Sequence, residues 1–543
     1  MERLLMFVPI PAGFDTGADR KMAIWRISST LKFTFLAAVF LVSGCVNHAD
    51  LAEAPGESLV VQSVPDLNYL ATRDYYHELI SGAMPSIAEL TLFTNQLPKG
   101  GDLHHHYSGA LYVETYLDWV DESHFCICLD NACKGATKTG PEPAAKYEVV
   151  KNWKSGACAS AVELRTQKKY SAFYRDLLKR WSDKDFANHF HEQSPPDQQF
   201  FDTFGFFGSV SDYSYQEGLQ ALKQRAIAEN VLYLETMLKS APAIDSPALA
   251  KTLNALSADS SDRETEAAFQ AYFDFLANDP ASKAAVEEYA RSHEQAAVGI
   301  NDGSFMLRFQ TYVSRNSEPA KVFSGLYAAF AAANQSPLIV GVNMVGPENG
   351  YIAMRDYSLH MKMLRFLKQR FANVKLALHA GELVLGMVPP EGLKHHINEA
   401  VVIAGADRIG HGVDIVHEAA AYQLLDLMKS RNVAVEINLT SNAFILGVEN
   451  EAHPLALYRQ QAVPFVISTD DAGVSRNNLS DEYLQFTSRF RPSYEELKEA
   501  VYNSLRYAFL ADAEKRQLLR DLDRRFAIFE EQIADRVQSM PGH

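Results

Sequence analysis

The sequence predicts an α/β fold, a (β/α)8 TIM barrel with helical and disulfide-stapled insertions. Two observations lead to this prediction. Eight short, mostly apolar segments alternate with longer segments of helical pattern, and several of the apolar segments end in histidine or acidic residues. Strands that alternate with helices form parallel sheets, and eight such strands close a barrel whose active site lies at their carboxyl ends.

The predicted strands are short and recur along most of the chain. The first is the segment before His104, from about residue 97, and it follows a predicted helical region at 66–95. The other seven are separated by helical segments, which parallel strands need as crossover connections. These seven are 231–236, 305–311, 338–343, 374–378, 408–411, 433–437 and 463–467.

Two long segments interrupt the alternation of strands and helices. Residues 240–300, approximately, are rich in alanine and charged side chains, and they are predicted to be a helical insertion. A structureless loop of that length would be uncommon in a compact domain. Residues 121–166, approximately, have no clear periodicity and are predicted to be an insertion in a loop. The barrel with both insertions is expected to occupy residues 66–535.

Four cysteines, Cys126, Cys128, Cys133 and Cys158, lie in the second of these insertions. An even number of clustered cysteines in an exported chain predicts two disulfides. Three pairings are possible, and a Cys126–Cys128 bond is the least favoured by geometry. The alternative is a structural zinc site, but the spacing C-x-C-x4-C-x24-C does not match the usual zinc patterns.

Length, composition and charge favour a folded protein with a small-molecule partner. The chain has 543 residues, of which 47% are hydrophobic, and its formal net charge is −16. Nucleic-acid binding relies on lysine and arginine meeting phosphates, so this charge argues against a nucleic-acid partner. The oligomeric state does not follow from the sequence.

The N-terminal part of the chain is predicted to be a targeting segment. Residues 1–44 are interpreted as a signal peptide, because Arg26 and Lys32 precede a short apolar run at 33–42. Met22 is the more natural start, since the basic-then-apolar pattern begins only there.

Cys45 is predicted to carry a lipid anchor. It ends a Val-Ser-Gly-Cys stretch that resembles the lipobox of bacterial lipoproteins, and residues 45–65 then read as a flexible tether. The alternative is an ordinary signal peptide with an incidental cysteine. The protein is therefore expected to be exported, on the periplasmic or cell-surface side. Asn47 favours the outer membrane over the inner one.

The ends of the first, fifth and eighth strands contain a set of metal-binding residue types. His104 and His106 share one face of an extended strand, because alternate residues point the same way, and His105 points to the other face. Asp470 and Asp471 would repel each other unless a cation or hydrogen-bond donors stabilise them. A metal bound by His104, His106, His379 and Asp470 meets that need. Zinc suits these ligands, and iron, manganese or cobalt are alternatives.

Two further groups are candidates for proton transfer. His411 lies between two glycines at the end of the sixth strand, so it has room to act on a metal-activated water. Glu382 follows His379 by three residues and is a second candidate. An aromatic run at 200–207 is interpreted mainly as a core helix, with a wall beside a flat, apolar substrate as the alternative.

Taken together in their order, these motifs resemble adenosine deaminase, a member of the metal-dependent amidohydrolase barrels. The similarity spans residues 97–485, approximately. The export signal and the insertions also resemble the secreted adenosine deaminase-related growth factors. The motifs are Pro98-Lys99, Leu103-His-x-His106, Val340-Gly-Val-Asn-Met-Val-Gly346-Pro-Glu348, His379-Ala-Gly-Glu382, Arg408-Ile-Gly-His-Gly412, Glu436 with Ser441-Asn442, Ser468-Thr-Asp-Asp471 and Leu479-Ser-Asp-Glu-Tyr483.

The resemblance implies a role for each matched position. It implies one zinc ion per chain, His411 orienting and deprotonating the attacking water, and Glu382 protonating a purine ring nitrogen. A neutral Glu382 needs a raised pKa. Asp471 and the backbone N–H of Gly346 would each bind another ring nitrogen. His106 and Ser108 would also face the substrate, and Ser108 stands where many members have an acidic residue or asparagine at the sugar.

The implied reaction is the hydrolysis of adenosine or 2′-deoxyadenosine to inosine or deoxyinosine and ammonia. Three alternatives remain open at this point. The substrate could be another aminopurine, such as adenine or a modified adenosine. The barrel could catalyse another amidohydrolase reaction, or it could be a non-catalytic surface protein that binds purine nucleosides.

Overall fold

The computed structural model describes residues 66–137, 143–184 and 194–540. The predicted signal peptide, Cys45 and the tether lie outside these residues. Within the described ranges, no helix combines the length and the apolar character that crossing a membrane requires.

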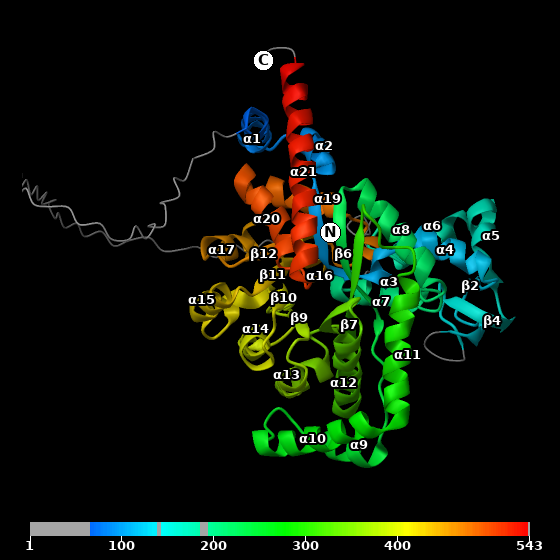
Figure 1. Ribbon diagram of the computed structural model, residues 1–543. Helices are drawn as coiled ribbons and strands as arrows, with labels where there is room; N and C mark the ends of the chain where they lie inside the picture. Colours follow the sequence, from blue (N-terminus) through cyan, green and yellow to red (C-terminus); the bar gives the residue numbers. More distant parts are fainter. Residues whose placement is uncertain (1–65, 138–142, 185–193, 541–543) are drawn as a thin grey trace, which may run out of the picture. The chain divides into compact units, whose positions relative to one another are not determined.

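Eight parallel strands form one sheet that curves into a barrel (Figure 1). This confirms the predicted fold class, and each strand overlaps the segment predicted for it. Most strand positions are buried, as in parallel sheets covered by helices. In sheet order the strands are β1 (Lys99–His106), β6 (Val231–Ser240), β7 (Met306–Ser314), β8 (Ile339–Val345), β9 (Lys375–Ala380), β10 (Arg408–His411), β11 (Ala434–Ile437) and β12 (Phe465–Ile467).

The barrel closes between β1 and the residues that follow β12. The Asp470 N–H donates to the His104 carbonyl at 2.9 Å, and the His106 N–H donates to the Asp470 carbonyl at 3.2 Å. One residue earlier, Thr469 donates to the buried Asp102 carboxylate from its hydroxyl at 2.5 Å and from its N–H at 3.3 Å. The seam therefore joins two segments that both contain candidate metal ligands.

Helices cover the outside of the barrel. The covering helices include α8 (Tyr215–Ala228), α12 (Pro319–Gln335), α13 (Tyr351–Arg370), α15 (Ala421–Arg431), α20 (Tyr494–Arg506) and α21 (Asp512–Gln538). The last of these extends slightly beyond the expected domain end at 535. Two N-terminal helices, α1 (Leu67–Ile80) and α2 (Ile87–Gln96), precede β1, and α1 lies beside α21 (Figure 1).

The segment at 240–300 folds into three helices, α9 (Pro247–Leu253), α10 (Asp262–Asn278) and α11 (Pro280–Ala296). Their starts follow the sequence: Ser261 and Glu264 form a capping box, and a proline opens α11. The helices pack on α12, where the Phe269 and Phe323 rings stack with centroids 5.1 Å apart. This cover explains why α12 is apolar on nearly all sides.

The cysteine segment contains a small antiparallel sheet, a detail that its lack of periodicity did not predict. Its strands are β2 (Cys126–Cys128), β3 (Lys134–Ala136), β4 (Val149–Ser155) and β5 (Cys158–Ala159), in the order β3-β4-β2-β5. The two predicted disulfides are present, as Cys126–Cys158 and Cys128–Cys133. Strands this short leave no clear alternation in the sequence, whereas cross-links can hold them in place.

Candidate metal centre and active site

Four predicted metal ligands meet at the carboxyl end of the barrel. His104 and His106 come from β1, His379 from β9, and Asp470 from the segment after β12. His106 Nε2 lies 3.2 Å from His379 Nε2 and 3.2 Å from Asp470 Oδ1. Ligands about 2.0–2.1 Å from a tetrahedral zinc lie about 3.3 Å from one another. The observed separations therefore fit a zinc ion.

The charges around His104 favour a cation at the same point. His104 Nε2 is buried, makes no hydrogen bond within the described residues, and faces Asp470 Oδ1 at 3.4 Å. Burial lowers the pKa of His104, but its interactions with the Asp470 and Glu436 carboxylates outweigh burial and raise that pKa to about 10. An electrostatic field that holds a proton on this nitrogen also attracts a metal ion.

Two of the candidate groups have left-handed backbone conformations. His411 has φ 66° and Asp470 has φ 62°, values that cost non-glycine residues about 1–3 kcal/mol each. Backbone hydrogen bonds stabilise both conformations. The Gly412 N–H donates to the Ala380 carbonyl at 3.1 Å, and Asp470 forms the two backbone bonds of the barrel seam. Such turns direct both side chains inward at strand ends.

A cavity of ≈ 210 Å³ opens beside the four ligands. The helix α7 (Pro196–Phe207) contributes three phenylalanine side chains to one wall. The aromatic run is thus both core and wall, because Phe207 is buried in the core and Phe201 and Phe204 are half-buried at the cavity. The lining residues are His106, Ser108, Phe200, Phe201, Phe204, Tyr312, Val345, Gly346, His379, Glu382, His411, Asp470 and Asp471.

Glu382 lies in this cavity next to His411, with 3.7 Å between Glu382 Oε1 and His411 Nε2. Burial raises the pKa of Glu382, and the negative charges of Asp470 and Glu348 raise it further. The carboxyl group is therefore favoured in its neutral form, which can donate a proton.

A chain of hydrogen bonds determines which nitrogen of His411 holds the proton. The Leu455 N–H donates to His453 Nδ1 at 3.1 Å, so neutral His453 has its proton on Nε2. That nitrogen lies 3.1 Å from Asn442 Oδ1, and Asn442 Nδ2 lies 2.9 Å from His411 Nδ1. Because Nδ1 of His411 accepts a hydrogen bond, neutral His411 has its proton on Nε2, which faces the cavity.

Asp471 offers an unsatisfied oxygen to the cavity. Asp471 Oδ1 is buried and has no hydrogen-bond partner within the described part of the chain. Burial and the neighbouring Asp470 raise the pKa of Asp471. Gly109, in the short helix α3 (Tyr107–Ala110), lies so close that a Cβ there would be 1.5 Å from this oxygen. The contact restricts where the carboxyl group can point.

Comparison with known proteins agrees with this geometry. The adenosine deaminase family model matches residues 286–525. Adenosine deaminases of Vibrio cholerae serotype O1 and Escherichia coli are each 33% identical to the chain, over 190 and 181 residues. These matches cover 35% and 33% of this chain and 52% and 49% of those proteins, so the chain spans about half the length of the curated relatives it matches.

These matches support an adenosine deaminase-family protein. Among solved structures, an N6-mAMP deaminase of Arabidopsis aligns with a TM-score of 0.47 and 17% identity, over 80% of this chain and 99% of that one.

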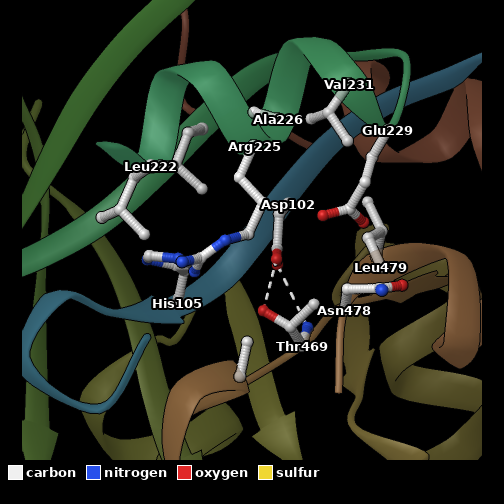
Figure 2. Close-up of a pocket in the computed structure, with 12 residues that line it drawn as sticks. Asp102, His105, Leu222, Arg225, Ala226, Glu229, Val231, Thr469, Asn478 and Leu479 are labelled. Carbon is white, nitrogen blue, oxygen red and sulfur yellow. Dashed lines mark hydrogen bonds between the residues drawn. The ribbon is translucent and has the colours of Figure 1, made fainter. Parts of the chain in front are cut away.

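The barrel also places the middle histidine of the first motif, His105, away from the metal centre. Figure 2 shows His105 in a separate cavity of ≈ 40 Å³ beside α8, with Arg225 and Asp102. His105 Nδ1 lies 2.8 Å from Thr236 Oγ1. A β-bulge between Asp102 and His105 explains why two residues at odd spacing line the same cavity.

Glu348, which had no predicted role, supports the backbone at Glu382. The Glu348 carboxylate accepts hydrogen bonds from the N–H groups of Gly381 at 3.1 Å and Glu382 at 2.9 Å. Arg315 lies 3.5 Å from it, and His396 Nδ1 lies 2.6 Å from it. Its position in the sequence could have indicated this role, because Glu348 is an acidic residue shortly after a predicted apolar strand and Gly346.

Glu348→Ala is expected to lower the free energy of unfolding by about 3–5 kcal/mol, because it leaves Arg315 buried without its carboxylate. Urea denaturation followed by circular dichroism measures this change. The matched control is Glu114→Ala, which removes a surface ion pair with Arg476 and should cost less than about 1 kcal/mol. An equal loss of unfolding free energy in the two variants would contradict the role of Glu348 as the buried partner of Arg315.

Proposed function

We propose that this protein hydrolyses adenosine or 2′-deoxyadenosine to inosine or deoxyinosine and ammonia. The main support is a single arrangement: the His104, His106, His379 and Asp470 cluster opens into a cavity that also contains Glu382 and His411. Zinc held by the four ligands would make hydroxide available near neutral pH, because it lowers the pKa of a water molecule.

In this proposal His411 orients the attacking oxygen. Its Nε2–H points into the cavity, so it donates a hydrogen bond to that oxygen and fixes its approach. Deprotonation of the water by His411, the second role suggested by the family resemblance, requires the opposite tautomer. The hydrogen bonds from Leu455 through His453 and Asn442 support the orienting role.

Glu382 protonates the purine ring nitrogen beside the carbon under attack. Hydroxide addition places negative charge on the ring, and a neutral carboxyl group in a buried site can supply the compensating proton. Asp471 binds the imidazole-side nitrogen, since its raised pKa favours a protonated carboxyl that can donate. The N–H of Gly346, at the end of β8, binds a third ring nitrogen.

The aromatic wall suits the shape of a purine. Phe201 and Phe204 of α7 present ring faces or edges at the cavity, where a flat base gains contact area and excludes water. A closed, apolar wall also strengthens the electrostatic interactions of the acidic groups opposite.

The direct test is the ultraviolet absorbance of the zinc-supplied mature chain with adenosine. We expect the shift from adenosine to inosine, and Glu382→Gln should lower kcat by about 10²–10⁴-fold because it removes a general acid. The wild-type rate should fall as pH rises through the raised pKa of Glu382, since the protonated form is the active one. Glu391→Gln, an exposed change near the same loop, is the control and should retain full activity.

A second candidate keeps the chemistry and changes the aminopurine. Ser108 lines the cavity where many family members have an acidic residue or asparagine at the sugar. Adenine and modified adenosines therefore belong in the substrate panel. Turnover of one of these in preference to adenosine would select this candidate, and binding without any turnover would indicate a purine-binding protein.

The charge of the cavity predicts a preference for neutral substrates. Its described lining contains Glu382, Asp470 and Asp471 and no lysine or arginine. A 5′-phosphate would find no lysine or arginine among these residues to compensate its charge, so kcat/KM for AMP should be about tenfold or more below that for adenosine. The comparison is made at one ionic strength, with 2′-deoxyadenosine as the neutral control. Equal values for AMP and adenosine would contradict the prediction.

We further propose that the protein works outside the cytoplasm as a lipoprotein. The two disulfides support an oxidising compartment. Mass spectrometry of the envelope fraction should find a fatty-acylated N-terminal peptide at Cys45 and a cross-linked Cys126–Cys158 peptide. Cys45→Ala should release the protein from the membrane, and an unmodified Cys45 in membrane-bound protein would refute the anchor.

A further inference from the structure

Five polar side chains on the barrel strands are completely buried and joined by hydrogen bonds in the barrel interior. They are Glu235 of β6, Gln310 of β7, Asn343 of β8, Arg408 of β10 and Glu436 of β11. Charged groups in such surroundings are costly unless each is paired and hydrogen-bonded. We call these five residues the floor chain.

One arm of the floor chain runs from Arg408 to His104. Arg408 Nε donates to Glu436 Oε1 at 2.6 Å, and Glu436 Oε2 lies 2.6 Å from His104 Nδ1. Glu436 is paired as a carboxylate with the Arg408 guanidinium. A carboxylate only accepts hydrogen bonds, so His104 donates from Nδ1.

The other arm runs from Arg408 to His379. Arg408 Nη2 donates to Glu235 Oε1 at 2.5 Å, and Gln310 Nε2 donates to the same oxygen at 2.9 Å. The amide of Gln310 therefore turns its oxygen toward Asn343, whose Nδ2 donates to it at 3.0 Å. Asn343 Oδ1 is then left facing His379 Nδ1 at 2.9 Å.

The direction of this second arm has independent support from the backbone. The N–H groups of Met344 and His379 donate to Asn343 Oδ1 at 2.8 Å and 3.3 Å. A flipped Asn343 amide would place its own N–H groups against these two donors. Asn343 Oδ1 is consequently an acceptor, and His379 donates to it from Nδ1.

We propose that the floor chain positions two of the four metal ligands, holding His104 and His379 with the proton on Nδ1 and Nε2 free for the metal. Arg408 sets the order, because a guanidinium can only donate and so every bond in both arms has one possible direction. The proposal rests on the metal centre of the proposed function and adds the residues that prepare it. None of the five contacts the cavity.

The test is the zinc affinity of the full mature chain, measured by competition with a colorimetric zinc chelator. Asn343→Leu should weaken zinc binding by about 10- to 100-fold, because His379 loses the acceptor that fixes its tautomer and ring orientation. Asn343→Asp keeps an acceptor at that place and should bind zinc at or above the wild-type level. This pair separates the hydrogen bond from mere occupancy of the site.

Gln310→Met is the second variant. Residue 310 contacts neither His104 nor His379, and methionine is close in size to glutamine. The variant should weaken zinc binding less than Asn343→Leu but in the same direction. The matched control is Thr311→Val, a buried polar change on the same strand, whose hydroxyl donates to the Gly341 carbonyl at 3.3 Å and not to the floor chain. It should leave zinc affinity unchanged.

The positioning role would be overturned if Asn343→Leu bound zinc as tightly as the wild type, or if Thr311→Val and Gln310→Met lost equal affinity. If the wild type binds zinc and deaminates adenosine while the zinc affinity of Asn343→Leu is unchanged, only this proposal is overturned. A folded wild-type chain that binds no zinc would overturn the metal centre together with it. Thermal unfolding of each metal-free variant shows that the chain being compared is folded.

Discussion

The seam between β1 and the segment after β12 is the constraint on which the site depends. Two backbone hydrogen bonds and the Asp102–Thr469 contacts close the barrel there. The first and last strands are more than 350 residues apart in the sequence, and closure alone brings His104 and His106 next to Asp470. Asp102 is almost completely buried there, and burial raises its pKa to about 7.

The electrostatics of the site follow from that closure. Several carboxyl groups, including Glu382, Asp470 and Asp471, share a small buried volume with the ligand histidines. Burial raises the pKa of Asp470, but hydrogen bonds from His104 and His106 outweigh burial and hold it ionised. Burial and the negative charge of Asp470 hold Glu382 and Asp471 neutral. Neighbouring carboxyl groups can therefore serve different purposes, one as a metal ligand and the others as proton donors.

The two insertions pack outside the barrel interior. The helices α9, α10 and α11 cover α12 on the outside, and the disulfide-linked sheet forms a separate small core around Cys128 and Cys133. α7, which follows that sheet along the chain, is the element that reaches the cavity. The cavity wall formed by α7 therefore comes from a different part of the chain than the strand ends that contain the candidate ligands.

Sequence alone determined the eight strands, the order of the motifs and the set of nine candidate site residues. Apolar runs of strand length mark a buried parallel sheet, and polar residues at their ends mark its active face, so both features are local. The short strands around the cysteines left no periodic signal, and the cysteine pairing stayed open because three connectivities share one sequence.

Only the tertiary structure decided which polar groups meet. Glu235, Gln310, Asn343 and Glu436 are visible in the sequence as polar residues within apolar strands, but their partners lie on other strands and depend on how the barrel closes. The proton position on His411 likewise depends on His453 and Asn442 lying in line with it. Hydrogen bonds between distant segments require distances and directions, and a linear pattern contains neither.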